Sequence, residues 1–450
     1  MNPTYAEVER LLLGRWPETR LEPSLDRIAA LCDLLGNPQG SFNVVHLTGT
    51  NGKTSTSRMI DTLLRALDLR TGRFTSPHLQ SMTERISIDG EPLSEALFVE
   101  AFADVAPFAE LVDDRSAAAG GAPLSYFEMV VAMAYAAFAD APVDVAVVEV
   151  GMGGSWDATN VADGQVAVVT PIGVDHARYL GDSAEVIAVE KAGIIKPGAQ
   201  AIIAEQEPAV LDVLMRRALE VGAKPLREGV DFAVSSRVNA VGGQQLSLQG
   251  TAARYDDIFL PLHGAFQARN AGYALAAVEA FTGGRELDAE LVREAFAQVT
   301  SPGRLEVVRR GPTVLLDAAH NPHGMQAAVE AVQDEFSFSP LIGVVGVMAD
   351  KDVEEILRIL EGVLAEIVVT QNSTPRSMPA AELGEIAEDI FGEDRVTVVR
   401  RLDDALERGV QLAETAVGFG DEVAGGGVLV TGSVVTVGEA RILFGGSGAA

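Results

Sequence analysis

A glycine-rich stretch at residues 49–54, with the sequence GTNGKT, follows the apolar run of residues 42–47 and precedes a segment of helical character that reaches about Leu67. A turn between a strand and a helix directs backbone N–H groups and the positive helix end to one point, which favours phosphate. The glycines allow close backbone approach, Lys53 can reach the outer phosphates, and the Thr54 hydroxyl can ligate Mg²⁺. The predicted phosphate-binding residues are Gly49, Thr50, Asn51, Gly52, Lys53 and Thr54.

The stretch departs from the standard phosphate loop, because Leu47 stands where the pattern G-x-x-x-x-G-K-[ST] has its first glycine. As a bare pattern it is moderately specific, and a strand-to-helix turn without a ligand is the alternative interpretation. The strand before the stretch and the helix after it are where the phosphate mechanism requires them, so we favour the phosphate site.

Two further candidates come after other apolar runs. Glu149 ends the run of residues 143–150 and is followed by glycines, and the pair Asp175-His176 follows the run of residues 166–170. Open α/β sheets bind ligands at the carboxyl ends of their strands, so these side chains are candidates for holding a metal or orienting water. A Glu satisfied by nearby backbone and a structural His are the alternatives. Oxygen ligands beside phosphate suit Mg²⁺, and one His among them is permitted.

Lysine is rare in this chain, which makes Lys191 conspicuous. The five lysines are Lys53, Lys191, Lys196, Lys224 and Lys351. Lys191 ends a predicted helix, where a cation paired with the helix C-terminus is the simplest interpretation. In the second half of the chain, Asp317 and His320 follow a strand and open a helix, the geometry of the phosphate loop without its lysine. Asp317 could hold a ribose or a metal-linked water, His320 could meet phosphate, and Arg304 could cross the cleft to a phosphoryl group.

Strand-length apolar runs alternate with helical segments over most of the chain, which predicts parallel sheets covered on both faces. We expect the fold class α/β: an N-terminal domain with the phosphate loop and a mostly parallel central sheet, and a smaller Rossmann-like α/β C-terminal domain. Residues 229–262 predict a small antiparallel piece, and residues 113–123 a mobile loop. The Pro- and Gly-containing stretch at residues 300–303 places the domain boundary, giving domains 1–300 and 301–450.

The composition of the 450 residues is that of a globular protein, with 48% hydrophobic and 22% charged residues. A formal net charge of −30 argues against nucleic acid and anionic membranes as partners. We see no signal peptide and no membrane-length apolar run, and the single Cys32, which we expect to be buried, fits a reducing compartment. We therefore expect a cytoplasmic protein, and a monomer.

Taken together, these stretches resemble the folylpolyglutamate synthase family and its bifunctional dihydrofolate synthase form, within the Mur ligase superfamily. The matching motifs run in order over nearly the whole chain: residues 49–54 (GTNGKT), 76–79 (SPHL), 127–128 (FE), 148–154 (VEVGMGG), 157–160 (DATN), 175–176 (DH), 190–194 (EKAGI), 302–306 (PGRLE), 317–322 (DAAHNP), 350–352 (DKD) and 432–433 (GS). As a set they are highly specific.

The resemblance implies that the loop and Lys53 bind ATP phosphates and that Lys191 is carbamylated by CO₂ to become an anionic metal ligand. It implies roles in the Mg²⁺ sites for Thr54, Ser76, Glu149, His176 and Lys191. It also implies that Asn270 and Arg304 contact ATP, that Asp317 and His320 complete the nucleotide site, and that folate lies in the cleft. Lys53, Lys191, His176 and Arg304 are the residues that we expect to support catalysis.

The chain departs from the family pattern at two places. Ser155 and Trp156 stand where the glycine motif normally continues with Arg, which puts an arginine-dependent substrate or metal contact in doubt. Phe266 stands where His usually precedes the residue equivalent to Gln267, as in some Mur ligases. Neither departure touches the phosphate loop.

The implied activity is that of an ATP-dependent ligase that joins L-glutamate to a folate through an acyl phosphate, with dihydropteroate as a second candidate acceptor. Another Mur-type amino-acid ligase is the nearest alternative, although the motifs at residues 76–79 and 127–128 favour the folate branch. A nucleotide-dependent regulatory ATPase is an alternative from another class. The chain has no Asn-Lys-x-Asp guanine motif, and a switch protein would not need Asp317 and His320.

Overall fold

The computed structural model describes residues 3–16, 22–175, 177–415 and 425–445. Its largest sheet has eight strands in the order β4-β3-β2-β5-β1-β6-β7-β8. Six neighbouring strands are parallel, and only β3 and β4 run antiparallel at one edge. The strands are β1 (Asn43–Thr48), β2 (Thr71–Phe74), β3 (Ile86–Ile88), β4 (Glu91–Pro92), β5 (Val145–Glu149), β6 (Val166–Val169), β7 (Gln200–Ile203) and β8 (Lys224–Arg227).

Helices cover both faces of this sheet, because its central strands are apolar on both sides. One face packs against α3 (Lys53–Ala66), α9 (Ala265–Phe281) and α10 (Ala289–Ala297). The opposite face packs against two groups of helices. They are α1 (Tyr5–Leu13), α2 (Asp26–Leu34), α4 (Glu95–Ala118) and α5 (Tyr126–Asp140), then α7 (Ala184–Lys191) and α8 (Pro208–Glu220), with the short α6 (Ala177–Leu180) before α7.

Two further sheets follow along the chain. β9 (Ala233–Ala240), β10 (Gly243–Gln249) and β11 (Arg254–Leu260) form the antiparallel piece that the sequence predicts. The six-stranded sheet has the order β12-β13-β17-β14-β15-β16 and is parallel except for β12. Its strands are β12 (Glu306–Arg310), β13 (Thr313–Leu316), β14 (Leu341–Val345), β15 (Glu366–Val369), β16 (Val396–Val398) and β17 (Gly427–Thr431).

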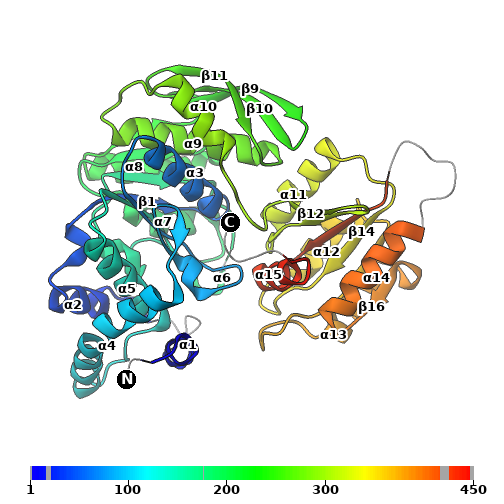
Figure 1. The fold of residues 1–450 in the computed structure, drawn as a ribbon, viewed down its shortest axis with the longest axis horizontal. Coiled ribbons are helices and arrows are strands. Elements are labelled where there is room, and N and C mark those ends of the chain that lie inside the picture. The colour runs from blue at the N-terminus through cyan, green and yellow to red at the C-terminus, as the bar shows by residue number, and fades with distance from the viewer. Residues whose placement is uncertain (1–2, 17–21, 176, 416–424, 446–450) are drawn as a thin grey trace.

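Helices also cover both faces of the six-stranded sheet. One face packs against α11 (Pro322–Glu335), α12 (Val353–Glu361) and α13 (Ala380–Phe391), and the other against α14 (Leu402–Thr415) and α15 (Val434–Leu443). Figure 1 shows this C-terminal region, yellow to red, beside the blue-to-green N-terminal region that ends with α10. The α/β fold class with mostly parallel sheets is confirmed. No helix in the described parts of the chain is long and apolar enough to span a membrane.

Helix α11 contacts the N-terminal region at both of its ends. At its start, Asn321 and His323 reach the phosphate loop. At its end, the buried carboxylate of Glu335 accepts hydrogen bonds from the Gly264 backbone N–H at 2.6 Å and from the side chain of Arg237, and pairs with His263 Nδ1 at 2.7 Å. One 14-residue helix is therefore held at two separate places.

Some local predictions are wrong. The expected loop of residues 113–123 is helical as far as Ala118, because its alanines favour helix and Asp113 has partners that hold it there. The Asp113 carboxylate pairs with Arg15 at 3.0 Å and accepts from the Leu124 N–H at 2.7 Å. Strand β12, which lies at the sheet edge, has no counterpart in the sequence prediction.

Candidate active site

The predicted phosphate loop lies between β1 and α3, as the sequence indicates. Gly49 has a φ of 145°, and a Cβ there would lie 1.9 Å from Thr170 Oγ1. Gly52 has a φ of 90°, and a Cβ there would lie 2.7 Å from Asn270 Oδ1. Both positions therefore need glycine, on steric and conformational grounds. Asn270, on α9, is thus placed against the loop, where its amide also donates to Gln267 at 3.0 Å.

Lys53 lies folded over this loop. Its Nζ donates to the carbonyl oxygens of Gly49 at 3.0 Å and Thr50 at 3.1 Å. Desolvation lowers the pKa of Lys53, while the carboxylates of Glu149 and Asp175 raise it. An ammonium group is therefore held close to the backbone groups that would surround a phosphate.

Glu149 ends β5, which is the neighbour of β1 in the sheet, so its carboxylate lies beside the loop. It is 1% exposed and accepts hydrogen bonds from the hydroxyls of Thr54, at 3.0 and 3.1 Å, and Thr75, at 2.5 Å. Burial raises the pKa of Glu149, whereas Lys53 and the two hydroxyls lower it. A buried carboxylate and a hydroxyl in contact are hard oxygen donors of the kind that Mg²⁺ prefers. Ser76 directly follows Thr75 and is half-buried.

Lys191 points towards the loop from the end of α7. The side chain is buried, and its Nζ donates to the Gly49 carbonyl oxygen at 2.9 Å, so its partner is not the end of its own helix. Desolvation, with a further contribution from the positive charge of Lys53, lowers the pKa of Lys191 to about 7. Near neutral pH a substantial fraction of this amine is therefore unprotonated.

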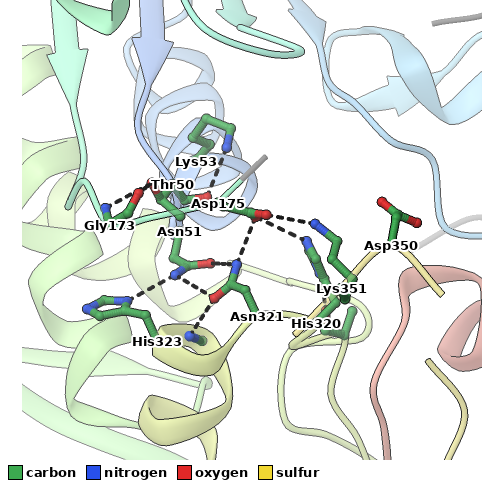
Figure 2. A network of polar contacts seen from close by, with 12 residues as sticks. Thr50, Asn51, Lys53, Gly173, Asp175, His320, Asn321, His323, Asp350 and Lys351 are labelled. Atoms are coloured by element: carbon green, nitrogen blue, oxygen red, sulfur yellow. Dashed lines mark hydrogen bonds and ion pairs between the residues drawn. The ribbon is translucent and has the colours of Figure 1, made fainter. Parts of the chain in front are cut away.

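Asp175 connects the loop side of the site with the C-terminal region, as Figure 2 shows. Its carboxylate pairs with Lys351 Nζ at 2.7 Å and accepts from Asn321 Nδ2 at 3.0 Å. His320 Nε2 lies 3.9 Å from the same carboxylate. His176, the next residue and a predicted metal ligand, lies outside the described residues. The ionic contact between Asp175 and Lys351 joins the two regions at the predicted nucleotide site.

The predicted C-terminal site residues have distinct surroundings. Asp317 is buried, and its carboxylate accepts from the backbone N–H groups of Leu305 at 3.0 Å and Ala319 at 2.9 Å. Burial raises the pKa of Asp317, and the positive charge of Arg304 lowers it.

His320 Nδ1 lies 2.9 Å from the Ala318 carbonyl oxygen, which can only accept, so Nδ1 carries the proton. Desolvation lowers the pKa of His320 to about 4, so this imidazole is neutral at pH 7.

Arg304 lies in the connection between α10 and β12. Its Nη1 donates to the Gly303 carbonyl oxygen at 3.2 Å, and its charge affects the pKa values of Lys53 and Glu149 as well as that of Asp317. The structure thus brings Arg304 near residues of both regions, and its contact with a phosphoryl group stays a prediction.

Three contributors to this site are not among the predicted site residues. They are Thr75, Asn321 and Lys351. The rarity of lysine was a usable signal for Lys351, which lies within a matched motif. Asn321 also lies within a matched motif, although an Asn before a proline at a helix start is ordinary, and Thr75 carries no comparable signal.

The structure shows what Ser155 and Phe266, at the two departures from the family pattern, contact. The Ser155 hydroxyl donates to the Glu190 carbonyl oxygen at 3.0 Å, beside the end of α7. Phe266, in the first turn of α9, packs against the core of the six-stranded sheet and so contributes to the contact between the two regions.

Comparison with known proteins adds independent evidence. Residues 124–278 match the Mur ligase middle domain, and residues 303–434 match the Mur ligase, glutamate ligase domain. The dihydrofolate synthase/folylpolyglutamate synthase of Mycobacterium tuberculosis is 52% identical over 455 residues, covering 98% of this chain and 93% of the relative. The Escherichia coli dihydrofolate synthase/folylpolyglutamate synthase is 32% identical, covering 81% of each chain.

Solved structures agree over the whole fold. The Mycobacterium tuberculosis folylpolyglutamate synthase complexed with ADP and AMPPCP superimposes with a TM-score of 0.93 at 51% identity, covering 98% of both chains. Escherichia coli FolC in complex with DHPP and ADP gives a TM-score of 0.84 at 28% identity, again covering 98% of both chains. The resemblance read from the motifs is confirmed, and the chain belongs to the dihydrofolate synthase/folylpolyglutamate synthase family of Mur ligases.

Proposed function

We propose that this enzyme is an ATP-dependent ligase that adds L-glutamate to a folate, and that it also accepts dihydropteroate. The observation that carries the proposal is the meeting of the phosphate loop with Asp175, Lys351 and His320, from two regions of one chain, in the manner expected of a closed nucleotide site. The relatives support the activity by name, and their structures hold ADP, AMPPCP and DHPP.

The reaction needs no nucleophilic side chain. A carboxylate oxygen of the folate attacks the γ-phosphorus of ATP, and the bond to ADP breaks, giving an acyl phosphate. The amine of glutamate attacks the acyl carbon, the C–N bond forms, and phosphate leaves while the amine loses its extra proton. Lys53 and Arg304 offset the charge on the moving oxygens. Contact between the two regions excludes water, which would hydrolyse the acyl phosphate.

Thr54 and Glu149 fit a Mg²⁺ site, since their oxygen atoms already lie 3.0 to 3.1 Å apart beside the loop. Ser76 and His176 complete the proposed set. Mg²⁺ would supply charge neutralisation for the phosphate oxygens. Asn270, Asp317 and His320 are proposed nucleotide contacts.

Lys191 is the proposed site of carbamylation. Carbamate forms when an unprotonated amine attacks CO₂, giving an N–C bond and releasing one proton. The lowered pKa of Lys191 supports this step at neutral pH, and its Nζ is 2.9 Å from the Gly49 carbonyl oxygen in the phosphate loop. The product is an anion, which would serve as a metal ligand where the lysine cannot. A ¹³C NMR signal for a carbamate in ¹³C-bicarbonate, absent in Lys191→Gln, would support it, and an unchanged spectrum would contradict it.

The organisation of the chain is part of the proposal. We place a domain boundary at residues 300–301, which falls between the end of α10 at Ala297 and the start of β12 at Glu306. The monomeric state and the cytoplasmic location stay predictions.

The experiment is ATP-dependent incorporation of labelled glutamate with Mg²⁺ and bicarbonate, run in parallel on dihydropteroate and tetrahydrofolate. Incorporation on both is expected. Incorporation on tetrahydrofolate alone would mean a chain-extending enzyme. Incorporation on neither would contradict the proposal and favour another Mur-type substrate, and steady ATP hydrolysis without either substrate would favour a regulatory ATPase.

A further inference from the structure

A pocket of about 480 Å³ lies away from the phosphate loop, between the end of α7, the short 3₁₀ helix of Ala192–Ile194 and α8. Its walls carry three cationic side chains, those of Lys196, Arg216 and Arg217. A concentration of cations is unexpected in a chain with 64 acidic and 34 basic residues, because nearby carboxylates would normally pair with them.

The two arginines have no carboxylate partner among the described residues. Arg216 Nε donates only to the Asp212 carbonyl oxygen of its own helix, at 3.3 Å. Arg217 Nε is buried and has no hydrogen-bond acceptor in the described part of the chain. A buried guanidinium N–H without an acceptor is costly, so its retention at a pocket wall indicates an acceptor that comes from a ligand.

The other two charged groups at the pocket are Lys196 and Glu220, which leave three cationic side chains against one carboxylate in its lining. Lys196 lies 3.6 Å from Asp163, which is largely exposed, and donates to the Asn160 carbonyl oxygen at 3.0 Å. Burial lowers the pKa of Lys196, while Asp163 raises it and the charge of Arg217 lowers it. Glu220 is the one carboxylate among the described residues that line the pocket.

Asn160 adds a different requirement. Its Nδ2 donates to the carbonyl oxygens of Ser155 at 3.0 Å and Gly193 at 3.3 Å, which fixes the orientation of the amide. Its Oδ1 is buried and receives no hydrogen bond from the described residues, and Asn160 is one of the residues that line the pocket. A ligand that satisfies this wall therefore offers carboxylates to the arginines and an N–H donor to Asn160.

We propose that the pocket binds a γ-glutamyl peptide segment through its carboxylates and an amide N–H. Such a segment carries one α-carboxylate per residue, which suits Lys196, Arg216 and Arg217, and each γ-amide supplies an N–H for Asn160. The choice of γ-glutamyl chemistry rests on the proposed function, since glutamate addition makes such segments. The pocket also adjoins the active site in the chain, because Gly193 lines it two residues after Lys191.

The test is isothermal titration calorimetry of the full-length enzyme with a γ-linked triglutamate peptide and, separately, with inorganic phosphate. A saturating non-hydrolysable ATP analogue with Mg²⁺ occupies the phosphate loop during both titrations. We expect saturable triglutamate binding that weakens about tenfold or more in the double variant Arg216→Gln/Arg217→Gln. Arg285→Gln removes the same kind of charge from an exposed position outside the pocket and is the matched control.

A second variant keeps the test decisive if the double variant fails to fold. Glu220 is exposed, so Glu220→Gln leaves the fold intact and is expected to tighten triglutamate binding by removing the repelling carboxylate. Absence of saturable binding, equal affinity in the double variant, weaker binding in Glu220→Gln, or binding of phosphate alone would each overturn the proposal. The glutamate incorporation assay on the same samples tests the proposed function separately. If triglutamate binds but no glutamate is incorporated, the proposed ligase activity is contradicted and the pocket proposal is not.

Discussion

Asn51 of the phosphate loop and Asn321 at the start of α11 donate hydrogen bonds to each other's side-chain oxygen, at 3.3 and 3.2 Å. This reciprocal amide pair joins the residue that shapes the phosphate site to the C-terminal region (Figure 2). Asn321 Oδ1 also accepts from the Gly324 N–H at 2.7 Å, so one side chain caps a helix and joins the two regions.

Asn321→Asp separates these two tasks. The carboxylate can still cap α11, but it has no N–H for Asn51 and it adds a negative charge opposite Asp175. We expect kcat/KM for ATP to fall by about tenfold or more, with little change in the Tm. Steady-state kinetics and differential scanning calorimetry measure the two effects. Asn321→Ala also removes the cap, which costs about 1 kcal/mol of stability, so this variant should have a lower Tm as well. A Tm loss in the Asp variant equal to that in the Ala variant would contradict this interpretation.

Glu149→Gln is expected to raise the Tm and to lower kcat. Burial raises the pKa of Glu149. Above this folded pKa the buried carboxylate lowers the free energy of unfolding, and the loss becomes smaller as the pH falls and the carboxylate is protonated. The neutral amide removes that cost, so the Tm at pH 7 without Mg²⁺ should rise, while kcat should fall about a hundredfold. Calorimetry with and without Mg²⁺ checks this, since the variant should also lose any Mg²⁺-dependent rise in Tm. An unchanged kcat would exclude Glu149 from the metal site.

Lys191 should make stability depend on pH above neutrality. Its folded pKa of about 7 is below the unfolded value of about 10.4, so between these values the unfolded chain binds a proton that the folded chain does not. Stability therefore rises with pH through this window, and the penalty is complete below pH 7. In CO₂-free buffer, the Tm difference between Lys191→Met and the natural enzyme should shrink from pH 7 to pH 10. A difference that stays constant would show that Lys191 keeps an ordinary pKa.

Lys351→Met should loosen the contact between the two regions. Lys351 and Asp175 are 9% and 12% exposed, so little solvent replaces the lost ammonium group. We expect a larger radius of gyration by small-angle X-ray scattering with the nucleotide bound, and a kcat/KM reduced by about tenfold. In a double-mutant cycle with Asp175→Asn, the effects of the two substitutions on kcat/KM should not add, because both remove the same ion pair. Arg358→Gln, which breaks an exposed pair with Glu354 on α12, is the control and should behave as the natural enzyme.

The sequence predicts those parts of the site that depend on local order. The loop at residues 49–54 could be predicted because a strand, two glycines with positive φ and a helix follow one another within a few residues. Glu149 could be predicted because it ends a strand. The contact between Asp175 and Lys351 could not, because the two residues are 176 positions apart and only the docking of two sheets brings them together.

The same reasoning explains the errors in the fold. The helix through Ala118 is supported by its alanines and by the contacts of Asp113 with Arg15, which is far away in the sequence, and with the backbone N–H of Leu124. Edge strand β12 pairs only with β13, and its half-exposed residues give no alternation that distinguishes it from a loop.

Helix α11 has a consequence for the timing of turnover. Its 14 residues span about 20 Å, with Asn321 and His323 bound to the loop at one end and Glu335 bound to Gly264 and His263 at the other. A helix held at both ends can move away from the N-terminal region as a whole only after both sets of contacts are lost. We expect the rate of ADP departure to depend on Glu335, which lies a full helix length from the contact of α11 with the phosphate loop.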